Sequence, residues 1–321
     1  MQSGNGEAVD ATVGDVGEFG MIDLVRAQAG TGRRVLIGPG DDAAHVDTDT
    51  GRVLISTDLL IEGRHFRRDW ATAEQIGRRA AAANLSDINA MGGVATALTV
   101  GLAAPADLPS QWVLDLTQGF EQECSAVGAH VVGGDMSDAD VVVIAVTVLG
   151  EASVPVTRSG AAPGDIVALA GRLGWSGAGL AALSRGFRSP RSVVQAHLVP
   201  EPPYTAGPAA ALAGATSMID VSDGLLADLE HIARSSEVVI DLDTGRLEIP
   251  EPVETVAGAL GRDALEFVLT GGEDFALVAT FGPDSDLPDG WHPIGAVFAA
   301  DEPGVLVDGE VYEGDGGHRH W

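Results

Sequence analysis

The sequence predicts a mixed α/β fold divided into two domains. The chain has 321 residues, about twice the ~150 residues of a typical domain. Short β-branched runs alternate with segments of helical periodicity, which is typical of α/β units. Residues 151–165 interrupt this alternation with Pro and Gly turn signals. We therefore predict a flexible tail over residues 1–16, an N-terminal domain over residues 17–150 and a C-terminal domain over residues 151–321.

The elements of the first domain follow from the apolar pattern. β-branched runs that end near Gly or Asp predict strands, and these are residues 35–38, 53–56, 131–132 and 141–149. Helical spacing of apolar residues predicts one helix over 72–91, begun by a capping box of Thr72 and Gln75, and another over 110–128. Residues 88–106 are rich in Gly, Ala and Thr, so we interpret them as a helix end, a turn and a strand rather than a membrane span.

The same alternation restarts after the junction. Apolar runs predict strands at 166–170, 218–219, 238–242, 276–280, 291–297 and 305–307. Helical periodicity predicts helices over 178–185, 205–213 and 225–235.

The charge of the chain excludes several classes of function. There are 47 acidic and 18 basic residues, a formal net charge of -29, and every basic residue is arginine. Without lysine there is no phosphate-binding loop of the usual type, no Schiff base and no lysine general base. An acidic chain also repels nucleic acid and anionic membranes. Because the first residues lack a charged and then apolar signal pattern, we expect a cytoplasmic protein.

The single cysteine, Cys124, precludes an intrachain disulfide. It lies in a helical segment with no basic neighbour, so we predict a packing role for it and not a reactive thiol.

Three glycine-containing motifs have alternative interpretations. Residues 38–43 match a dinucleotide fingerprint, but Asp41 and Asp42 would face the pyrophosphate and a strand follows, which disfavours nucleotide binding of that kind. Residues 47–51 begin like a calcium loop, but Gly51 stands at the fifth position, which needs a ligand, and Arg52 at the sixth, which needs a glycine, so a hairpin turn is favoured. Residues 171–179 could cradle phosphate or allow tight packing, and both readings stay open.

Aspartates repeatedly follow the predicted strands, and these are Asp41, Asp42, Asp58, Asp135, Asp220 and Asp223. Asp87 joins them from the helix, with Asn84 three residues earlier, and Ser56, Thr57 and Ser222 add hydroxyls. For each aspartate alone, a role as a turn residue is the favoured interpretation. As a set, oxygen ligands at strand ends favour a hard cation, above all Mg²⁺. Several magnesium ions in an acidic cleft indicate chemistry on polyphosphate, with arginine completing the neutralisation: Arg64, Arg67, Arg68 and Arg158.

At these residues the sequence resembles the thiamine-monophosphate kinase family, in the superfamily of aminoimidazole ribonucleotide synthetase and selenophosphate synthetase. The motifs that carry the resemblance are, in chain order, residues 40–44, 56–60, 62–66, 84–87 with 91–92, 133–135, 158–160, 220–225 and 271–275. Three features depart from the family pattern: Met136 follows Gly-Gly-Asp, Phe275 replaces a frequent tyrosine, and the chain ends in Gly317-His318-Arg319-His320-Trp321.

The resemblance implies an α/β N-terminal dimerisation domain, an α+β C-terminal domain, an ATP cleft between them and a homodimer. It implies that magnesium is held by Asp42, Ser56, Thr57, Asp58, Asp87, Asp135, Asp220 and Asp223. It implies that ATP is contacted by Gly134, Asp135, Arg158 and Ser222. The expected contacts to thiamine monophosphate are His65, Glu273 and a C-terminal aromatic residue, Trp321, although His318 is an alternative.

The implied reaction is direct in-line transfer of the γ-phosphoryl group of ATP to thiamine monophosphate, assisted by several Mg²⁺ ions. A phosphate monoester has its second pKa near ~6, so we expect no covalent nucleophile and no strong general base. The thiazolium of the substrate is cationic, which suits Glu273. The alternatives are a synthetase of the same superfamily that forms selenophosphate or a purine intermediate, and a non-catalytic acidic metal-binding protein. A selenophosphate enzyme should carry a reactive cysteine and a lysine near its N-terminus, which this sequence lacks.

Overall fold

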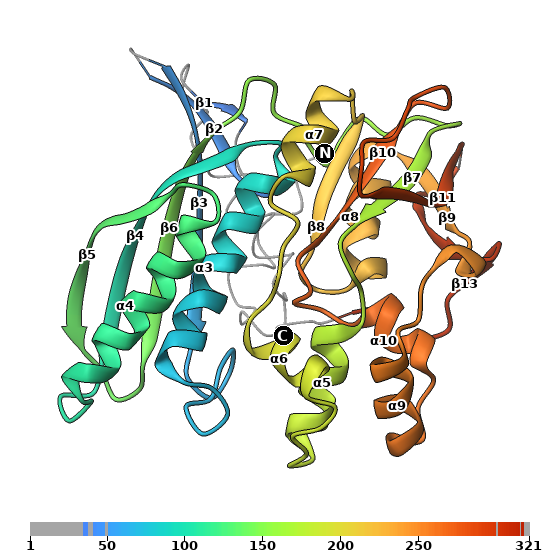
Figure 1. Ribbon diagram of the computed structural model, residues 1–321. Coiled ribbons are helices and arrows are strands. Elements are labelled where there is room, and N and C mark those ends of the chain that lie inside the picture. The colour runs from blue at the N-terminus through green and yellow to red at the C-terminus, as the bar shows by residue number, and fades with distance from the viewer. Residues whose placement is uncertain (1–34, 38–40, 49–50, 300, 315, 318–321) are drawn as a thin grey trace, which may run out of the picture.

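The computed structural model describes residues 35–37, 41–48, 51–299, 301–314 and 316–317. The predicted tail over residues 1–16 and the predicted substrate contact Trp321 lie outside these residues. Figure 1 shows two lobes, each built from one sheet and the helices that cover it. The two-domain, mixed α/β fold predicted from the sequence is therefore confirmed.

The N-terminal lobe contains a six-stranded sheet in the order β1-β2-β3-β6-β4-β5. Its strands are β1 (Val35–Ile37), β2 (Ala44–Thr48), β3 (Gly51–Ile61), β4 (Val94–Ala104), β5 (His130–Asp138) and β6 (Val143–Glu151). Among these, β4 and β5 pair in parallel, and the other neighbours are antiparallel. Strands β3 and β5 are longer than predicted, so Asp58 and Asp135 lie within strands and not after them.

Helices α3 (Ala73–Ala90) and α4 (Ser110–Ser125) cover one face of this sheet. The predicted capping box begins α3: Gln75 N donates to Thr72 Oγ1 at 3.2 Å, and Thr72 N donates to Gln75 Oε1 at 3.0 Å. These two bonds satisfy backbone donors that the first turn leaves open. Gly92, with φ of 70°, follows the end of the helix and turns the chain into β4.

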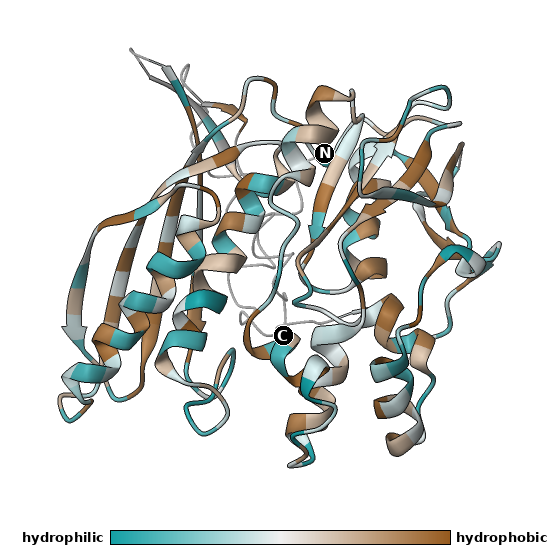
Figure 2. Ribbon diagram, in the orientation of Figure 1, coloured by the Kyte–Doolittle hydropathy of each residue, from teal (hydrophilic) through white to brown (hydrophobic). Residues whose placement is uncertain are grey.

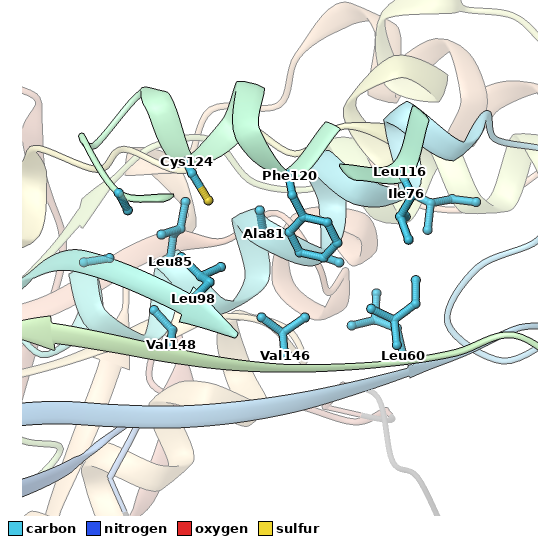
Figure 3. Packing of buried hydrophobic residues seen from close by; sticks show 14 of the residues in the cluster. Leu60, Ile76, Ala81, Leu85, Leu98, Leu116, Phe120, Cys124, Val146 and Val148 are labelled. Carbon is cyan, nitrogen blue, oxygen red and sulfur yellow. The ribbon is translucent and has the colours of Figure 1, made fainter. Parts of the chain in front are cut away.

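Apolar side chains from α3, α4 and the strands form the N-terminal core (Figure 3). Ile76 and Leu85 of α3 and Phe120 of α4 are fully buried, and Val146 of β6 meets them from the sheet. Each buried side chain of this size stabilises the fold by about 1.5–3 kcal/mol. Cys124 is buried in the same core, and burial raises the pKa of its thiol to about 12, which confirms its predicted packing role.

The C-terminal lobe contains a seven-stranded sheet in the order β13-β12-β9-β11-β7-β10-β8. The strands are β7 (Ile166–Ala170), β8 (Ser217–Val221), β9 (Val238–Leu242), β10 (Ala276–Phe281), β11 (Trp291–Ala299), β12 (Gly304–Val307) and β13 (Glu310–Val311). The pairs are antiparallel except for β12 with β9. Figure 2 shows hydrophobic residues concentrated in the strands of both sheets.

The helices of this lobe are α5 (Trp175–Ser184), α6 (Arg191–Leu198), α7 (Ala206–Leu212), α8 (Leu225–Ser236), α9 (Glu251–Leu260) and α10 (Ala264–Thr270), with the 3-10 turn η1 (Thr244–Arg246). The sequence pattern did not predict α6, α9 and α10. These helices are short, and their apolar residues pack with those of α5 in a separate cluster. Because short helices are marginally stable alone, tertiary packing stabilises them. Among the described residues, no helix has the length and apolar character needed to cross a membrane.

Helix α3 lies between the two lobes (Figure 1) and contacts β3, β4 and β6 on one side and α6, α7 and β8 on the other. The side that meets the C-terminal lobe carries Arg79, Ser86 and Asn89, at helical spacing. Asn89 donates to Pro203 O at 3.1 Å and accepts from Gly207 N at 3.0 Å. Polar contacts from one helix therefore join the two domains.

The close approach of α3 and α4 generates a stability prediction. A Cβ at Gly119 would lie 2.0 Å from Glu74 O, so no side chain fits there. We expect Gly119→Ala to lower the free energy of unfolding by about 1–3 kcal/mol or more. The control is Gly258→Ala at an exposed position of α9, where no atom lies within 4 Å of the added Cβ, and alanine should raise stability by about 0.5–1 kcal/mol. Urea denaturation measures both, and equal stability of the two variants would contradict this packing.

Candidate functional site

Three carboxylates from distant parts of the chain converge where the two lobes meet. Asp42 precedes β2, Asp87 lies on α3, and Asp220 lies on β8. One carboxylate oxygen of each lies within 4.8 Å of the others. Asp58 on β3 is near enough for its charge to raise the pKa of Asp87. The structure therefore brings together four of the predicted carboxylate ligands.

Each of the three converging carboxylates accepts a hydrogen bond from a donor on a different element. Ser56 Oγ donates to Asp87 Oδ2 at 2.6 Å, and Ser86 Oγ donates to Asp220 Oδ2 at 2.6 Å. These donors hold the two carboxylates in fixed orientations across the junction of the lobes.

Asp42 has a charged partner. Arg158 donates to it through Nη2 at 2.9 Å and through Nε at 3.2 Å, and its backbone N donates to Asp41 Oδ1 at 2.7 Å. Burial acts to lower the pKa of Arg158, but the carboxylate of Asp42 outweighs it and raises that pKa. Arg158, predicted as an ATP contact, thus lies beside the acidic cluster as a permanent cation.

The carboxylates of the cluster repel one another. Burial raises the pKa of Asp87 well above its ordinary value, and the charges of Asp58, Asp220 and Asp42 raise it further. Burial and the charge of Asp42 do the same to the pKa of Asp220, and burial raises the pKa of Asp58. A cluster of this kind favours either bound protons or a bound cation.

The donor chemistry fits a divalent cation with a preference for oxygen. Asp42, Asp58, Asp87 and Asp220 offer carboxylate oxygens, the ligands that Mg²⁺ prefers. Asn84 lies one helical turn before Asp87, and its buried Oδ1 is the side-chain acceptor for which the described residues supply no hydrogen-bond donor. A buried acceptor without a partner indicates that a water or an ion belongs nearby.

The loop after β8 is held by a residue that the sequence analysis did not identify. Asp228, in the first turn of α8, accepts backbone N–H bonds from Ser222, Asp223 and Gly224 at 3.0, 3.1 and 3.1 Å, all through Oδ2. This positions Ser222, predicted as an ATP contact, and Asp223, predicted as a metal ligand, without placing Asp223 in the three-carboxylate group. The sequence contains a signal for this role: Asp228 is an acidic residue in the first turn of a helix that begins after Asp-Gly. Carboxylates at that position bind the backbone N–H groups that the helix itself leaves open.

Thr57, another predicted metal ligand, lies on the other face of the N-terminal sheet from the cluster. Strand residues alternate between faces, and Ser56 and Asp58 point toward α3. The hydroxyl of Thr57 instead contacts Val146 O at 2.7 Å and Thr147 Oγ1 at 3.1 Å. The structure does not bring the Thr57 side chain to the cluster, because its hydroxyl lies on the opposite face.

Gly134 and Asp135 also lie away from the cluster in this chain. Register places Asp58, Val146, Val100 and Gly134 in one row across β3, β6, β4 and β5. Three strand spacings amount to about 14 Å. A Cβ at Gly134 would lie 1.9 Å from Val100 O, so packing alone requires glycine there.

The two predicted substrate contacts, His65 and Glu273, lie close enough to interact. His65 follows β3, and its Nδ1 accepts from Ile61 N at 3.0 Å. Burial acts to raise the pKa of Glu273, but the charge of Arg79 outweighs it and His65 acts in the same direction, so the pKa is lowered and the carboxyl is ionised at neutral pH. The structure therefore places a carboxylate and an imidazole, one from each lobe, within electrostatic reach of each other.

The glycine-rich segment 171–179, for which two interpretations stayed open, is explained by packing and by the carboxyl group of Asp274. Asp274 accepts from Gly174 N at 2.6 Å and from Ser176 N at 2.7 Å, so its carboxylate occupies the N-terminus of α5. A Cβ at Gly177 would lie 3.0 Å from Gly271 Cα. These contacts do not support the interpretation of the segment as a phosphate-binding loop, because the side chain of Asp274 already accepts from the backbone N–H groups of Gly174 and Ser176.

Family models match both lobes. Residues 40–152 match the N-terminal domain of AIR synthase related proteins, and residues 162–286 match the C-terminal domain of the same proteins. Together with the two-sheet fold and the carboxylates at the junction of the lobes, these matches define an AIR synthase related protein.

Within this class the chain belongs to the thiamine-monophosphate kinase family. It is 48% identical over 316 residues to the thiamine-monophosphate kinase of Mycobacterium tuberculosis, covering 95% of this chain and 92% of that protein. The enzyme of the same name from Corynebacterium glutamicum is 40% identical, covering 89% and 87%.

Solved structures support the same relationship. A structure described as AaThiL complexed with AMPPCP and TMP superposes with a TM-score of 0.87 at 32% identity and covers 97% of this chain and 99% of that one. The hydrogenase maturation protein HypE in complex with ATP has a TM-score of 0.65 at 18% identity, with 83% and 84% covered, which shows a shared fold.

The repulsion in the cluster predicts a pH-dependent stability difference. The folded pKa of Asp87 is raised above its ordinary value of 3.8, so above about pH 4 the folded chain retains a proton that the unfolded chain has released. Its contribution to stability is therefore lost as the pH rises. In a metal chelator, Asp87→Asn should gain stability over the wild type between pH 4 and neutrality, by about 1.4 kcal/mol for each unit of pKa shift.

Thermal or urea unfolding at several pH values measures this difference. A difference between Asp87→Asn and the wild type that stays constant, or that shrinks as the pH rises, would show that Asp87 is not under repulsion.

Proposed function

We propose that this protein is a thiamine-monophosphate kinase, which transfers the γ-phosphoryl group of ATP to thiamine monophosphate and forms thiamine diphosphate. The observation that carries the proposal is the convergence of Asp42, Asp87 and Asp220, within 4.8 Å, at the junction of two AIR synthase related domains. Relatives with this name match nearly the whole chain, and a solved relative holds AMPPCP and TMP.

Asp42, Asp58, Asp87 and Asp220 would hold Mg²⁺, which supplies the positive charge that lets two polyanions approach. Ser56, Ser86 and Arg158 keep three of these carboxylates oriented. Arg158 adds a permanent cation beside the phosphates. Because the chain has no lysine, arginine and metal must supply all of this charge.

The acceptor requires no proton to be removed by the protein. A phosphate monoester has its second pKa near ~6 and is already ionised at neutral pH, so direct in-line attack needs positioning and neutralisation of charge. Cys124, the one thiol, is buried in the core and cannot serve as the reactive cysteine expected of a selenophosphate synthetase. Transfer without a covalent intermediate is the route that these residues support.

His65 and Glu273 are the substrate contacts that this proposal favours. Glu273 is ionised, and 34% of its side chain is exposed, so its carboxylate suits the cationic thiazolium ring. The Nδ1 atom of His65 accepts a backbone N–H, which places the proton of the neutral ring on Nε2 as a donor.

We also propose a homodimer formed through the sheet of the N-terminal lobe. Helices α3 and α4 cover one face of that sheet. On the strands, Leu59 is 51% exposed and Val132 is 65% exposed, and exposed apolar residues on a sheet are typical of an interface. Gly134 and Asp135 lie on the edge strand β5, so a second copy would bring further residues near them.

ATP as co-substrate supports a cytoplasmic location.

The activity prediction uses purified protein with ATP, Mg²⁺ and thiamine monophosphate. Thiamine diphosphate should form, free thiamine should not be phosphorylated, and EDTA should abolish turnover. Loss of one charge-stabilising group in a site of this kind costs about 10²–10³ in kcat, and we expect this from Asp58→Asn and Asp87→Asn. Chromatographic separation of the thiamine phosphates measures the product.

The matched control is Asp284→Asn, an exposed turn residue, which should leave turnover unchanged. Asp135→Asn tests whether β5 takes part in the site. Wild-type protein that makes no thiamine diphosphate would refute the proposed function, and unchanged turnover in Asp58→Asn and Asp87→Asn would refute the role of the cluster.

The dimer prediction is tested by light scattering coupled to size exclusion. The wild type should show twice the 32.8 kDa mass of the chain, and Val132→Arg should shift it toward the monomer, because burying an unpaired charge is costly. Leu212→Arg is the control, since Leu212 is 89% exposed on α7 in the other lobe. A monomeric wild type would show that this face forms no stable dimer.

A further inference from the structure

A buried guanidinium connects the two lobes beside the predicted substrate carboxylate. Arg79 lies on α3 and is 5% exposed. Its Nη2 donates to Glu273 Oε2, and its Nη1 donates to His197 O at 2.8 Å and lies 3.2 Å from His197 Nε2. One side chain of the N-terminal lobe thus binds two separate segments of the C-terminal lobe.

His197 is the neutral member of this group. Burial, with the charge of Arg79, lowers the pKa of His197 to about 3. Since arginine can only donate, His197 Nε2 is the acceptor and Nδ1 carries the proton, which it donates to Ser176 Oγ at 3.0 Å. His197 therefore orients Arg79 without competing for its charge, and Glu273 is the carboxylate paired with Arg79.

The backbone of Glu273, the residue that Arg79 contacts, is held in an unfavourable conformation. Its φ is 63°, in the left-handed region, which residues other than glycine rarely adopt because Cβ crowds the backbone there. Glu273 N donates to Ser222 O at 2.7 Å, and the carboxylate of Asp274 binds the start of α5. These contacts fix the main chain, and Arg79 fixes the side chain.

We propose that Arg79 is a positioning residue for substrate recognition: it holds Oε2 of Glu273 so that Oε1 faces the cationic ring of the substrate. This rests on the proposed kinase function and on Glu273 as a substrate contact. Arg79 itself does not reach the substrate, because it is buried behind the carboxylate. The geometry also connects substrate binding with the junction of the lobes, since the carboxylate comes from one lobe and its orienting cation from the other.

The test compares Arg79→Met and Arg79→Lys in the full-length protein. Arg79→Met should raise KM for thiamine monophosphate by about tenfold or more, with KM for ATP within about twofold of the wild type, because truncating one partner of a buried charge pair leaves the Glu273 carboxylate without its orienting donor. Arg79→Lys keeps the charge but not the fork of donors, so it should recover part of the loss. Steady-state kinetics with each substrate varied in turn measures this split.

Two further variants separate positioning from folding. Arg78→Met removes the neighbouring guanidinium, which pairs with Glu123 inside the N-terminal lobe, and KM for thiamine monophosphate should not change. In Glu273→Gln, adding Arg79→Met should raise KM little further, because the carboxylate charge that Arg79 orients toward the substrate is already absent.

The outcomes are distinct. A wild type without kinase activity refutes the proposed function. With an active wild type, equal increases in both KM values for Arg79→Met, or additive effects in the double variant, would overturn the positioning role and leave the function standing. If Arg79→Met does not fold, an unchanged KM for thiamine monophosphate in Arg79→Lys and Glu273→Gln would overturn it instead.

Discussion

Buried negative charge at the junction of the two lobes is the constraint on which the rest of this structure depends. Asp42, Asp87 and Asp220 come within 4.8 Å of one another, and burial with mutual repulsion raises the pKa of the last two. Buried carboxylates are stable only when each accepts a hydrogen bond, and here a separate element supplies the donor to each of the three. The strand β3, the helix α3 and the segment that carries Arg158 must therefore meet at one place.

Helix α3 satisfies this requirement because it has two different faces. Ile76 and Leu85 pack on the N-terminal sheet, while Arg79, Ser86 and Asn89 bind the C-terminal lobe. Each of these polar contacts is buried, so breaking one would leave a donor or acceptor unsatisfied at a cost of about 1–3 kcal/mol. The helix that carries a metal-ligand candidate is thus also the element that fixes the relative position of the two domains.

The protein binds its own backbone donors with its own carboxylates. Asp228 occupies the N–H groups of the loop after β8, and Asp274 occupies those at the start of α5. In many other folds such N–H groups bind phosphate. With these positions filled and no lysine in the chain, the proposed reaction would rely on arginine, and on a cation bound at the carboxylates, to neutralise phosphate.

The sequence by itself determined the α/β alternation, the capping box at Thr72 and a set of oxygen ligands suited to a hard cation, because these depend on neighbours a few residues apart. Only the tertiary structure decided which of these predicted ligands lie together. Extension of β3 places Thr57 on the face opposite Ser56, and register places Gly134, the neighbour of Asp135, three strand spacings, or roughly 14 Å, from Asp58. The pairing of Arg79 with Glu273 spans 194 positions, and contacts that distant depend on how whole sheets and helices pack.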